Sequence, residues 1–233
     1  MEGTKNIRRK VIAEFSSPAD GPDQKRMFEL MRAIDYELTG NEMVAKLAAH
    51  REVKKQMPEF NKKPKPANYT HAIYLDKDEH GFLGLKIHPV DWPNGEVIMR
   101  FSSKTVANKI LEKILRENNL YAWFSVRSRM KGNEIDPKTL KNYNVHMEKA
   151  VKKYLYRQPN FFIISEGIHP EEHSAIWIEN NLYKGFGYFN PELTQATPEN
   201  LKEVIRAEED DSETQKIIRS LLRKMKNLKI VAY

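Results

Sequence analysis

The side chains of this sequence that could do chemistry are mainly cations, and they gather in two places. The first cluster lies near the N-terminus and comprises Lys5, Arg8, Arg9 and Lys10. The second runs through the middle of the chain and mixes cations with aromatic residues: Lys104, Lys109, Lys113, Arg116, Tyr121, Trp123, Phe124, Arg127, Arg129 and Lys131. Cations neutralise phosphates and aromatic rings stack on unpaired bases, so this mixture suits single-stranded or distorted nucleic acid. An equally good interpretation places Trp123 and Phe124 in a hydrophobic core.

The charge distribution favours the same ligand. The chain of 233 residues has a net charge of +7 and a pI near 9.3. Residues 100–157 hold 14 Lys/Arg against 5 Asp/Glu, whereas residues 67–99 and 158–233 are each at −3. A concentrated positive field attracts polyanions, of which nucleic acid is the commonest in the cytoplasm. A lysine-rich helix face that meets only solvent would give the same numbers, so both interpretations stay open.

Other kinds of site find less support. The absence of cysteine excludes disulfides and thiolate metal sites. His169 and His173 have the spacing of a metal pair, but Pro170 opposes the helix that would align them. The chain has no run of 18 apolar residues and no secretory signal at its start, so we expect a cytoplasmic protein with no membrane partner.

The periodicity of the N-terminal third predicts helices that would position the first cluster. We expect helices over residues 6–15 and 24–34, a short strand over 36–38, and a third helix that ends before Pro58. Thr39 and Glu42 have the spacing of a capping box for the third helix. Its predicted buried residues are Met43, Val44, Leu47 and Ala48. The basic, proline-containing stretch at 62–66 predicts a linker.

The rest of the chain predicts a mixture of strands and helices. The predicted strands cover residues 69–75, 82–88, 96–101, 161–165, 174–178, 183–189 and 228–231. The predicted helices begin after Ser102 or Ser103, at 148, at Pro198, and at Ser212, which Gln215 would help to cap; the central stretch 121–147 contains a polar loop and is hard to assign. The fold class is therefore α+β. We expect one module at 1–66 and a C-terminal region at 67–233, with possible subregions 67–157 and 158–233.

Several segments resemble one known family. They are TKNIRRKVIAEF at 4–15, YELTGNEMVAKLAAHREVKKQMPEFN at 36–61, NFFIISEGIHPEEHSAIWIENNLYKGFGYFN at 160–190, and DSETQKIIRSLLRKMKNLKIVAY at 211–233. In this order they resemble the GIY-YIG nucleases of the UvrC and Cho excinuclease type, in the form in which a polymerase III epsilon-type exonuclease is fused to a GIY-YIG domain. The resemblance implies an incomplete GIY-YIG-like α/β module at the N-terminus, because two of the three family sheet strands would precede residue 5.

The resemblance also implies that the catalytic positions have changed. Family members cleave phosphodiesters with a divalent metal held by a glutamate, and this position is Ala49 here. The family's catalytic arginine falls at Lys10, and lysine lacks the planar fork of arginine. Asn61 matches the family's terminal asparagine, although a turn residue at the end of a helix would look the same. Glu52 is the only plausible surrogate metal ligand, and a solvated helix charge explains it better.

Three hypotheses follow. The first is a non-catalytic relative of DNA-repair endonucleases that binds nucleic acid, DNA more than RNA, or supports a repair complex, and needs no cofactor. The second is an active endonuclease, part of a longer protein, that would use Mg²⁺ or Mn²⁺. The third is a protein-interaction module whose basic surface meets an acidic partner. The unpaired strand predicted at 36–38 also makes homo-oligomers plausible.

Overall fold

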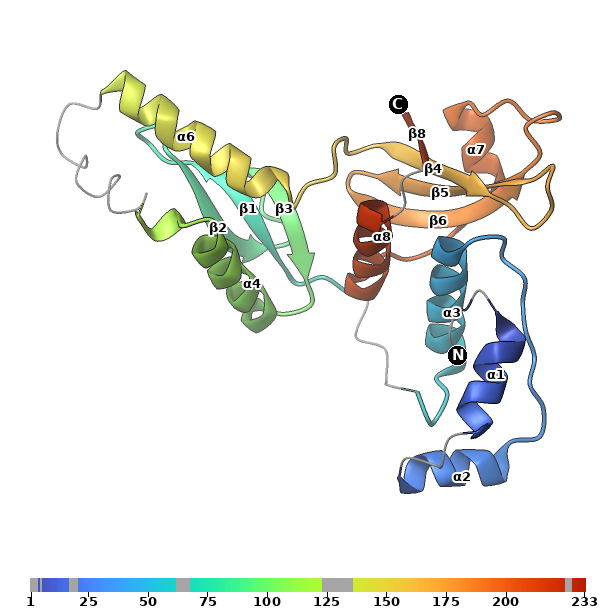
Figure 1. Ribbon diagram of the computed structural model, residues 1–233. Helices are drawn as coiled ribbons and strands as arrows, with labels where there is room; N and C mark the ends of the chain where they lie inside the picture. Colours follow the sequence, from blue (N-terminus) through green and yellow to red (C-terminus); the bar gives the residue numbers. More distant parts are fainter. Residues whose placement is uncertain (1–3, 5, 17–20, 62–67, 123–135, 225–227) are drawn as a thin grey trace. The chain divides into compact units, whose positions relative to one another are not determined.

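The computed structural model describes residues 4, 6–16, 21–61, 68–122, 136–224 and 228–233, and these form two compact units (Figure 1). Unit 1 joins residues 1–65 to residues 160–233, and unit 2 comprises residues 66–159. The sequence placed boundaries close to both positions but assigned the first and last segments to different domains. They form one unit because side chains more than 100 residues apart bond to each other, as Asn41 does to β4 and β5.

Unit 1 is built on a five-stranded antiparallel sheet with the order β7-β6-β5-β4-β8. The predicted hairpin is confirmed, and its two-residue turn at Asn180 and Asn181 has positive φ angles of 52° and 61°. Asparagine tolerates this left-handed conformation, which suits the twist of a hairpin. The short strand β7 was not predicted from the sequence. The strands are β4 (Phe161–Glu166), β5 (His173–Glu179), β6 (Leu182–Phe189), β7 (Ile205–Ala207) and β8 (Lys229–Ala232).

Helices cover both faces of this sheet, with α7 on one side and α8 and α3 on the other (Figure 1). Helix α7 (Pro198–Val204) begins at the predicted proline and contributes Leu201 to the core of its side of the sheet. Helix α8 (Ser212–Lys224) buries Thr214, Ile218 and Leu221. Its N-terminal amides bond to Asp211, so the predicted cap at Ser212 is wrong by one residue.

Helix α3 (Glu42–Gln56) attaches the first segment to this sheet. Its buried residues are the four that the sequence predicted, and α3 packs against α8. The predicted capping box is wrong: Asn41 is the N-cap and accepts a hydrogen bond from Val44 N at 3.0 Å. The side-chain amide of Asn41 donates to Glu166 O at 2.7 Å and Ser174 Oγ at 2.8 Å. One side chain therefore starts the helix and ties it to β4 and β5, a role that its local sequence does not reveal.

Gly40 explains how the chain approaches the sheet so closely. Its φ is +75°, and a Cβ there would lie 1.9 Å from Gly167 O. Any other residue would be strained and would clash with a backbone atom. Gly40 therefore fixes the start of α3 against the loop before β5.

The segment before Gly40 differs from its prediction. Residues 31–39 form no strand, so the strand predicted at 36–38 is wrong. Ile34, Tyr36 and Leu38 alternate as in a strand, but their side chains are 49%, 70% and 59% exposed. The pattern favours a strand only where a second strand supplies backbone partners, and the described residues supply none here. Helices α1 (Ile7–Ser16) and α2 (Pro22–Leu30) likewise have no fully buried residue.

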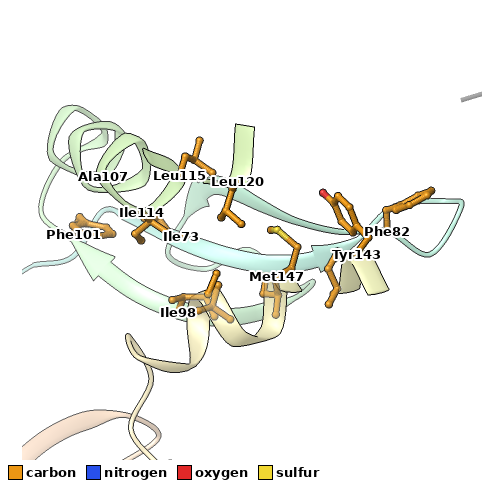
Figure 2. Packing of buried hydrophobic residues seen from close by; sticks show 14 residues of the cluster. Ile73, Phe82, Ile98, Phe101, Ala107, Ile114, Leu115, Leu120, Tyr143 and Met147 are labelled. Carbon is orange, nitrogen blue, oxygen red and sulfur yellow. The ribbon is translucent and has the colours of Figure 1, made fainter. Parts of the chain in front are cut away.

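Unit 2 is a three-stranded antiparallel sheet with the order β2-β1-β3, covered on one face by two helices. Ile73 and Leu75 of β1 face the core that α4 and α6 complete (Figure 2). The elements are β1 (His71–Lys77), β2 (Leu83–Pro89), β3 (Glu96–Phe101), α4 (Lys104–Glu117) and α6 (Pro137–Lys152). With two sheets and helices segregated to their faces, the predicted α+β class is confirmed.

Helix α6 is the largest departure from the sequence prediction in unit 2. The prediction began this helix at residue 148, whereas it begins at Pro137. Asp136 accepts hydrogen bonds from the amides of Lys138 and Thr139, and Pro137 occupies the first helical turn, where its missing N–H costs nothing. These two residues were the available signal for the start of the helix.

Within the described parts of the chain, no helix is long and apolar enough to cross a membrane.

Candidate nucleic-acid interface

Helix α4 presents three of the predicted phosphate-contacting residues together. Ser103 caps the helix by accepting a hydrogen bond from Val106 N at 3.3 Å. Ala107, Ile114 and Leu115 fix its buried side. Lys109, Lys113 and Arg116 are all exposed and lie within an arc of about 60° at 100° per residue. The sheet packing of α4 therefore turns one row of cations toward solvent.

The cations of this row are available to a ligand. Lys113 lies 3.8 Å from Glu117, with both side chains about half exposed, and such pairs contribute about 0–1 kcal/mol. Lys109 and Arg116 make no ion pair with any described residue. A phosphate could replace water around these groups without first displacing a strong partner.

Helix α6 adds cations that the sequence reasoning missed. Four of its lysines are exposed, namely Lys138, Lys141, Lys149 and Lys152. They were missed because the first half of this helix fell in the unassigned stretch. The helical spacing of the buried residues Tyr143, Met147, Ala150 and Val151 could have revealed it.

The charge of the protein is concentrated in unit 2. Residues 66–159 contain 16 Lys/Arg and 10 Asp/Glu, a net charge of +6, while the residues of unit 1 contain 23 and 22, a net charge of +1. Unit 2 therefore carries nearly all of the net positive charge that could attract a polyanion.

The N-terminal cluster belongs to unit 1, whereas the α4 row belongs to unit 2. Lys5 lies outside the described residues, and Arg8 and Arg9 are exposed on α1. Lys10 is part-buried and lies 3.7 Å from Glu14, one helical turn away. Arg127, Arg129 and Lys131, with Trp123 and Phe124, also lie outside the described residues. The aromatic–cation run is thus described only as far as Tyr121 and Ala122.

The residues that the sequence resemblance assigned to catalytic positions all belong to unit 1. Ala49 lies on α3, and Asn61 closes a turn by donating its N–H to Pro58 O at 3.1 Å. Glu52 accepts hydrogen bonds from Gln56 Nε2 at 3.1 Å and Arg51 Nε at 3.3 Å. The bond from Gln56 lowers the pKa of Glu52. Among the described residues, no three His, Asp or Glu side chains gather where they could hold a metal ion.

Unit 1 contains a cavity of about 330 Å³ between α3, β7 and the start of α8. Its walls carry an ionic network. Asp211 Oδ2 lies 2.8 Å from His50 Nε2 and 3.1 Å from Lys54 Nζ. Glu208 accepts from Tyr183 Oη at 2.9 Å and from Arg51 at 3.4 Å. Each carboxylate is already occupied by protein groups, so the network joins α3 to β7 and α8.

The pKa directions agree with this structural role. Burial would raise the pKa of Asp211, but bonds from His50, the Thr214 amide and Lys54 hold it well below its usual value. Burial and the neighbouring Glu208 raise the pKa of Tyr183 far above 10, so its hydroxyl stays protonated. Burial would lower the pKa of Arg51, but Glu208, Glu37 and Glu52 together raise it. The surroundings therefore keep Asp211 ionised, Arg51 charged and the Tyr183 hydroxyl protonated at neutral pH, which suits groups that hold elements together.

Sequence reasoning could not identify this network, because His50 and Asp211 are 161 positions apart. The only local signal was the acidic residue immediately before α8, which is typical of a helix cap.

Comparison with protein-family models, with curated proteins and with solved structures finds no match to this chain.

Proposed function

We propose that this protein binds nucleic acid, DNA more than RNA, as a non-catalytic relative of the DNA-repair GIY-YIG endonucleases, acting in the cytoplasm. The observation that supports it best is the row of exposed cations on α4, in the unit that holds +6 of the net charge of +7. Such a surface binds phosphate through counterion release, which does not depend on sequence.

We propose no catalysis because Ala49 and Lys10, at the family's reactive positions, lack the required chemistry and the possible surrogate Glu52 is already hydrogen-bonded. Ala49 has no metal ligand, and Lys10 offers a point charge instead of the arginine fork. Glu52 is occupied by two neighbours on its own helix. Binding should therefore proceed without Mg²⁺ or Mn²⁺.

The test compares two variants by fluorescence anisotropy with labelled duplex DNA, single-stranded DNA and RNA. The first carries Lys109→Gln, Lys113→Gln and Arg116→Gln on α4. The matched control carries Lys25→Gln, Lys184→Gln and Lys216→Gln in unit 1. We expect the salt slope, log Kd against log salt, to fall by about 2 to 3 for the first variant with duplex DNA and by much less for the control. Absence of binding to any nucleic acid at 50 mM salt would overturn the proposal.

A nicking assay tests the non-catalytic part. Supercoiled plasmid with Mg²⁺ or Mn²⁺ should remain intact. Metal-dependent nicking that Glu52→Ala abolishes would instead support the active-endonuclease alternative, with Glu52 as the metal ligand.

A second candidate function is protein interaction, and the N-terminal segment favours it. Ile34, Tyr36 and Leu38 expose an alternating apolar pattern, and Ile12 and Phe15 of α1 are also 53% and 44% exposed. A second copy or a repair-protein partner could cover these side chains. Sedimentation velocity of the wild type against Tyr36→Ser/Leu38→Ser tests self-association: a dimer that the variant loses supports it, and a monomer at all concentrations contradicts it.

A further inference from the structure

We infer that α6 carries a second phosphate-contacting row, formed by Lys138, Lys141, Lys149 and Lys152, and that this row fits across the major groove of B-form DNA. The inference rests on the proposed function and deepens it, since it names the form of nucleic acid and a set of contacts separate from those of α4.

The four lysines lie on one stripe of the helix. At 100° per residue, positions 138, 141, 149 and 152 fall within an arc of about 80°. All four side chains are exposed, and so is Val145, which lies on the same stripe between the two lysine pairs. The buried residues Tyr143, Met147 and Ala150 occupy the opposite side of the helix.

Contacts on the buried side fix the rotation of α6. The side chain of Asn144 accepts a hydrogen bond from Leu83 N and donates to Gly81 O, each at 2.9 Å. The ring of Tyr143 packs edge-on against Phe82 with centroids 5.1 Å apart, at the end of the core shown in Figure 2. Because these contacts hold the helix to the β1–β2 turn, the lysine row cannot rotate toward the sheet.

The row sets four positive charges against one neighbouring carboxylate of its own helix, Glu148, which lies about 20° beyond Lys141 at 100° per residue. Glu148 is the only carboxylate in α6, and it is exposed. None of the four lysines forms an ion pair with a described residue. Their charges are therefore free to meet phosphate.

The spacing along the helix favours a duplex. Lys138 and Lys152, at the ends of the row, are 14 positions apart, or about 21 Å at 1.5 Å per residue. Lys141 and Lys149 are eight residues apart, or about 12 Å, which equals the width of the B-DNA major groove of about 12 Å. One lysine pair can then meet each phosphate rim while Val145 faces the groove. A-form RNA has a narrow major groove that does not offer this span, and the row has no aromatic ring on which unpaired bases could stack.

The test is the variant Lys138→Gln/Lys141→Gln/Lys149→Gln/Lys152→Gln in the full chain. Each lost phosphate contact should reduce the salt slope for duplex DNA by about 0.9, so the four together should reduce it by about 3 to 4. Each pair alone should account for about half. The reduction should be smaller with double-stranded RNA and with single-stranded DNA.

The matched control is Lys25→Gln/Lys184→Gln/Lys216→Gln/Lys229→Gln, which removes the same charge from unit 1. An equal reduction in this control would show that net charge alone matters and would overturn the inference. So would an unchanged slope in the α6 variant, or an equal reduction with double-stranded RNA or single-stranded DNA. If the α4 variant weakens binding and the α6 variant does not, the proposed function stands and this inference fails. If the wild type binds no nucleic acid, both fail.

Discussion

Units 1 and 2 use the same basic residue types in opposite ways. In unit 1, two cations of α3 pair with carboxylates that are largely buried: Lys54 with Asp211, and Arg51 with Glu208. In unit 2, the lysines of α4 and α6 point to solvent and are mostly unpaired. A paired, partly buried cation specifies how elements pack, whereas an unpaired, solvated one attracts a ligand. The number of cations in a segment therefore says little until their partners are known.

The largest expected difference between the units is in their response to salt. Raising NaCl from 50 to 200 mM should weaken duplex DNA binding by about 10³- to 10⁴-fold, because seven cations on α4 and α6 would exchange phosphates for salt ions. The urea midpoint of unfolding should change little, because the paired charges of unit 1 are partly shielded from solvent. Anisotropy titrations and urea melts over the same salt range measure both. Binding that is insensitive to salt would remove the contrast between the units.

The next largest effect should come from breaking the network of unit 1. Asp211→Ala removes the helix cap of α8 and leaves His50 and Lys54 without their carboxylate. We expect a loss of about 3–5 kcal/mol in the free energy of unfolding, measured by urea denaturation. Glu209→Ala, an exposed neighbour, is the control and should cost less than about 0.5 kcal/mol. Equal effects in the two variants would show that the network does not stabilise unit 1.

Acid should reduce the contribution of Asp211 to the free energy of unfolding. Because the folded protein holds the pKa of Asp211 well below its usual value, Asp211 stabilises the fold above the unfolded pKa of 3.8. This contribution is lost as the pH falls from about 4 through the lower folded pKa. The stability difference between wild type and Asp211→Asn should therefore be largest near neutral pH and shrink below about pH 4. A difference that stays constant down to pH 2 would contradict this assignment.

A smaller effect should come from the Asn144 contact of unit 2. Asn144→Ala leaves Leu83 N and Gly81 O without their partner, which should cost about 1–3 kcal/mol. Asn142→Ala, on the exposed side of the same helix, should cost less than about 0.5 kcal/mol. Thermal unfolding of both variants measures the difference. If they are equally stable, Asn144 does not fix α6, and the orientation of its lysine row loses its support.

The sequence predicted most elements whose signals are local. The buried set of α3 and the C-terminal hairpin were predicted correctly, and the cap of α4, Ser103, is one of the two serines that the sequence offered. The predictions that failed concern segments whose secondary structure depends on a partner elsewhere in the chain or on a stretch without a clear local pattern. Residues 36–38 have a strand pattern but no neighbouring strand in the described chain, and α6 was shortened because most of its first half fell in a stretch that the sequence left unassigned.

The candidate interface likewise has one part that local sequence patterns could predict and one part that they could not. The charge excess and the α4 row could be predicted, because a cation's position on an amphipathic helix follows from periodicity. The α6 row could not, since its helix was not recognised. The network of His50, Asp211 and Glu208 joins residues about 160 positions apart, and neither periodicity nor composition encodes such a pairing.

Residue order alone thus established the class of elements, the apolar faces that they bury and the part of the chain that carries the positive charge. These follow from backbone preferences and from the 3.6-residue and two-residue repeats. Only the tertiary structure joined residues 1–65 to 160–233, paired Arg51 and Lys54 of α3 with distant carboxylates and left the cations of α4 and α6 in solvent. The reason is that a side chain's partner depends on which distant segments pack together, and that choice is made by the whole chain.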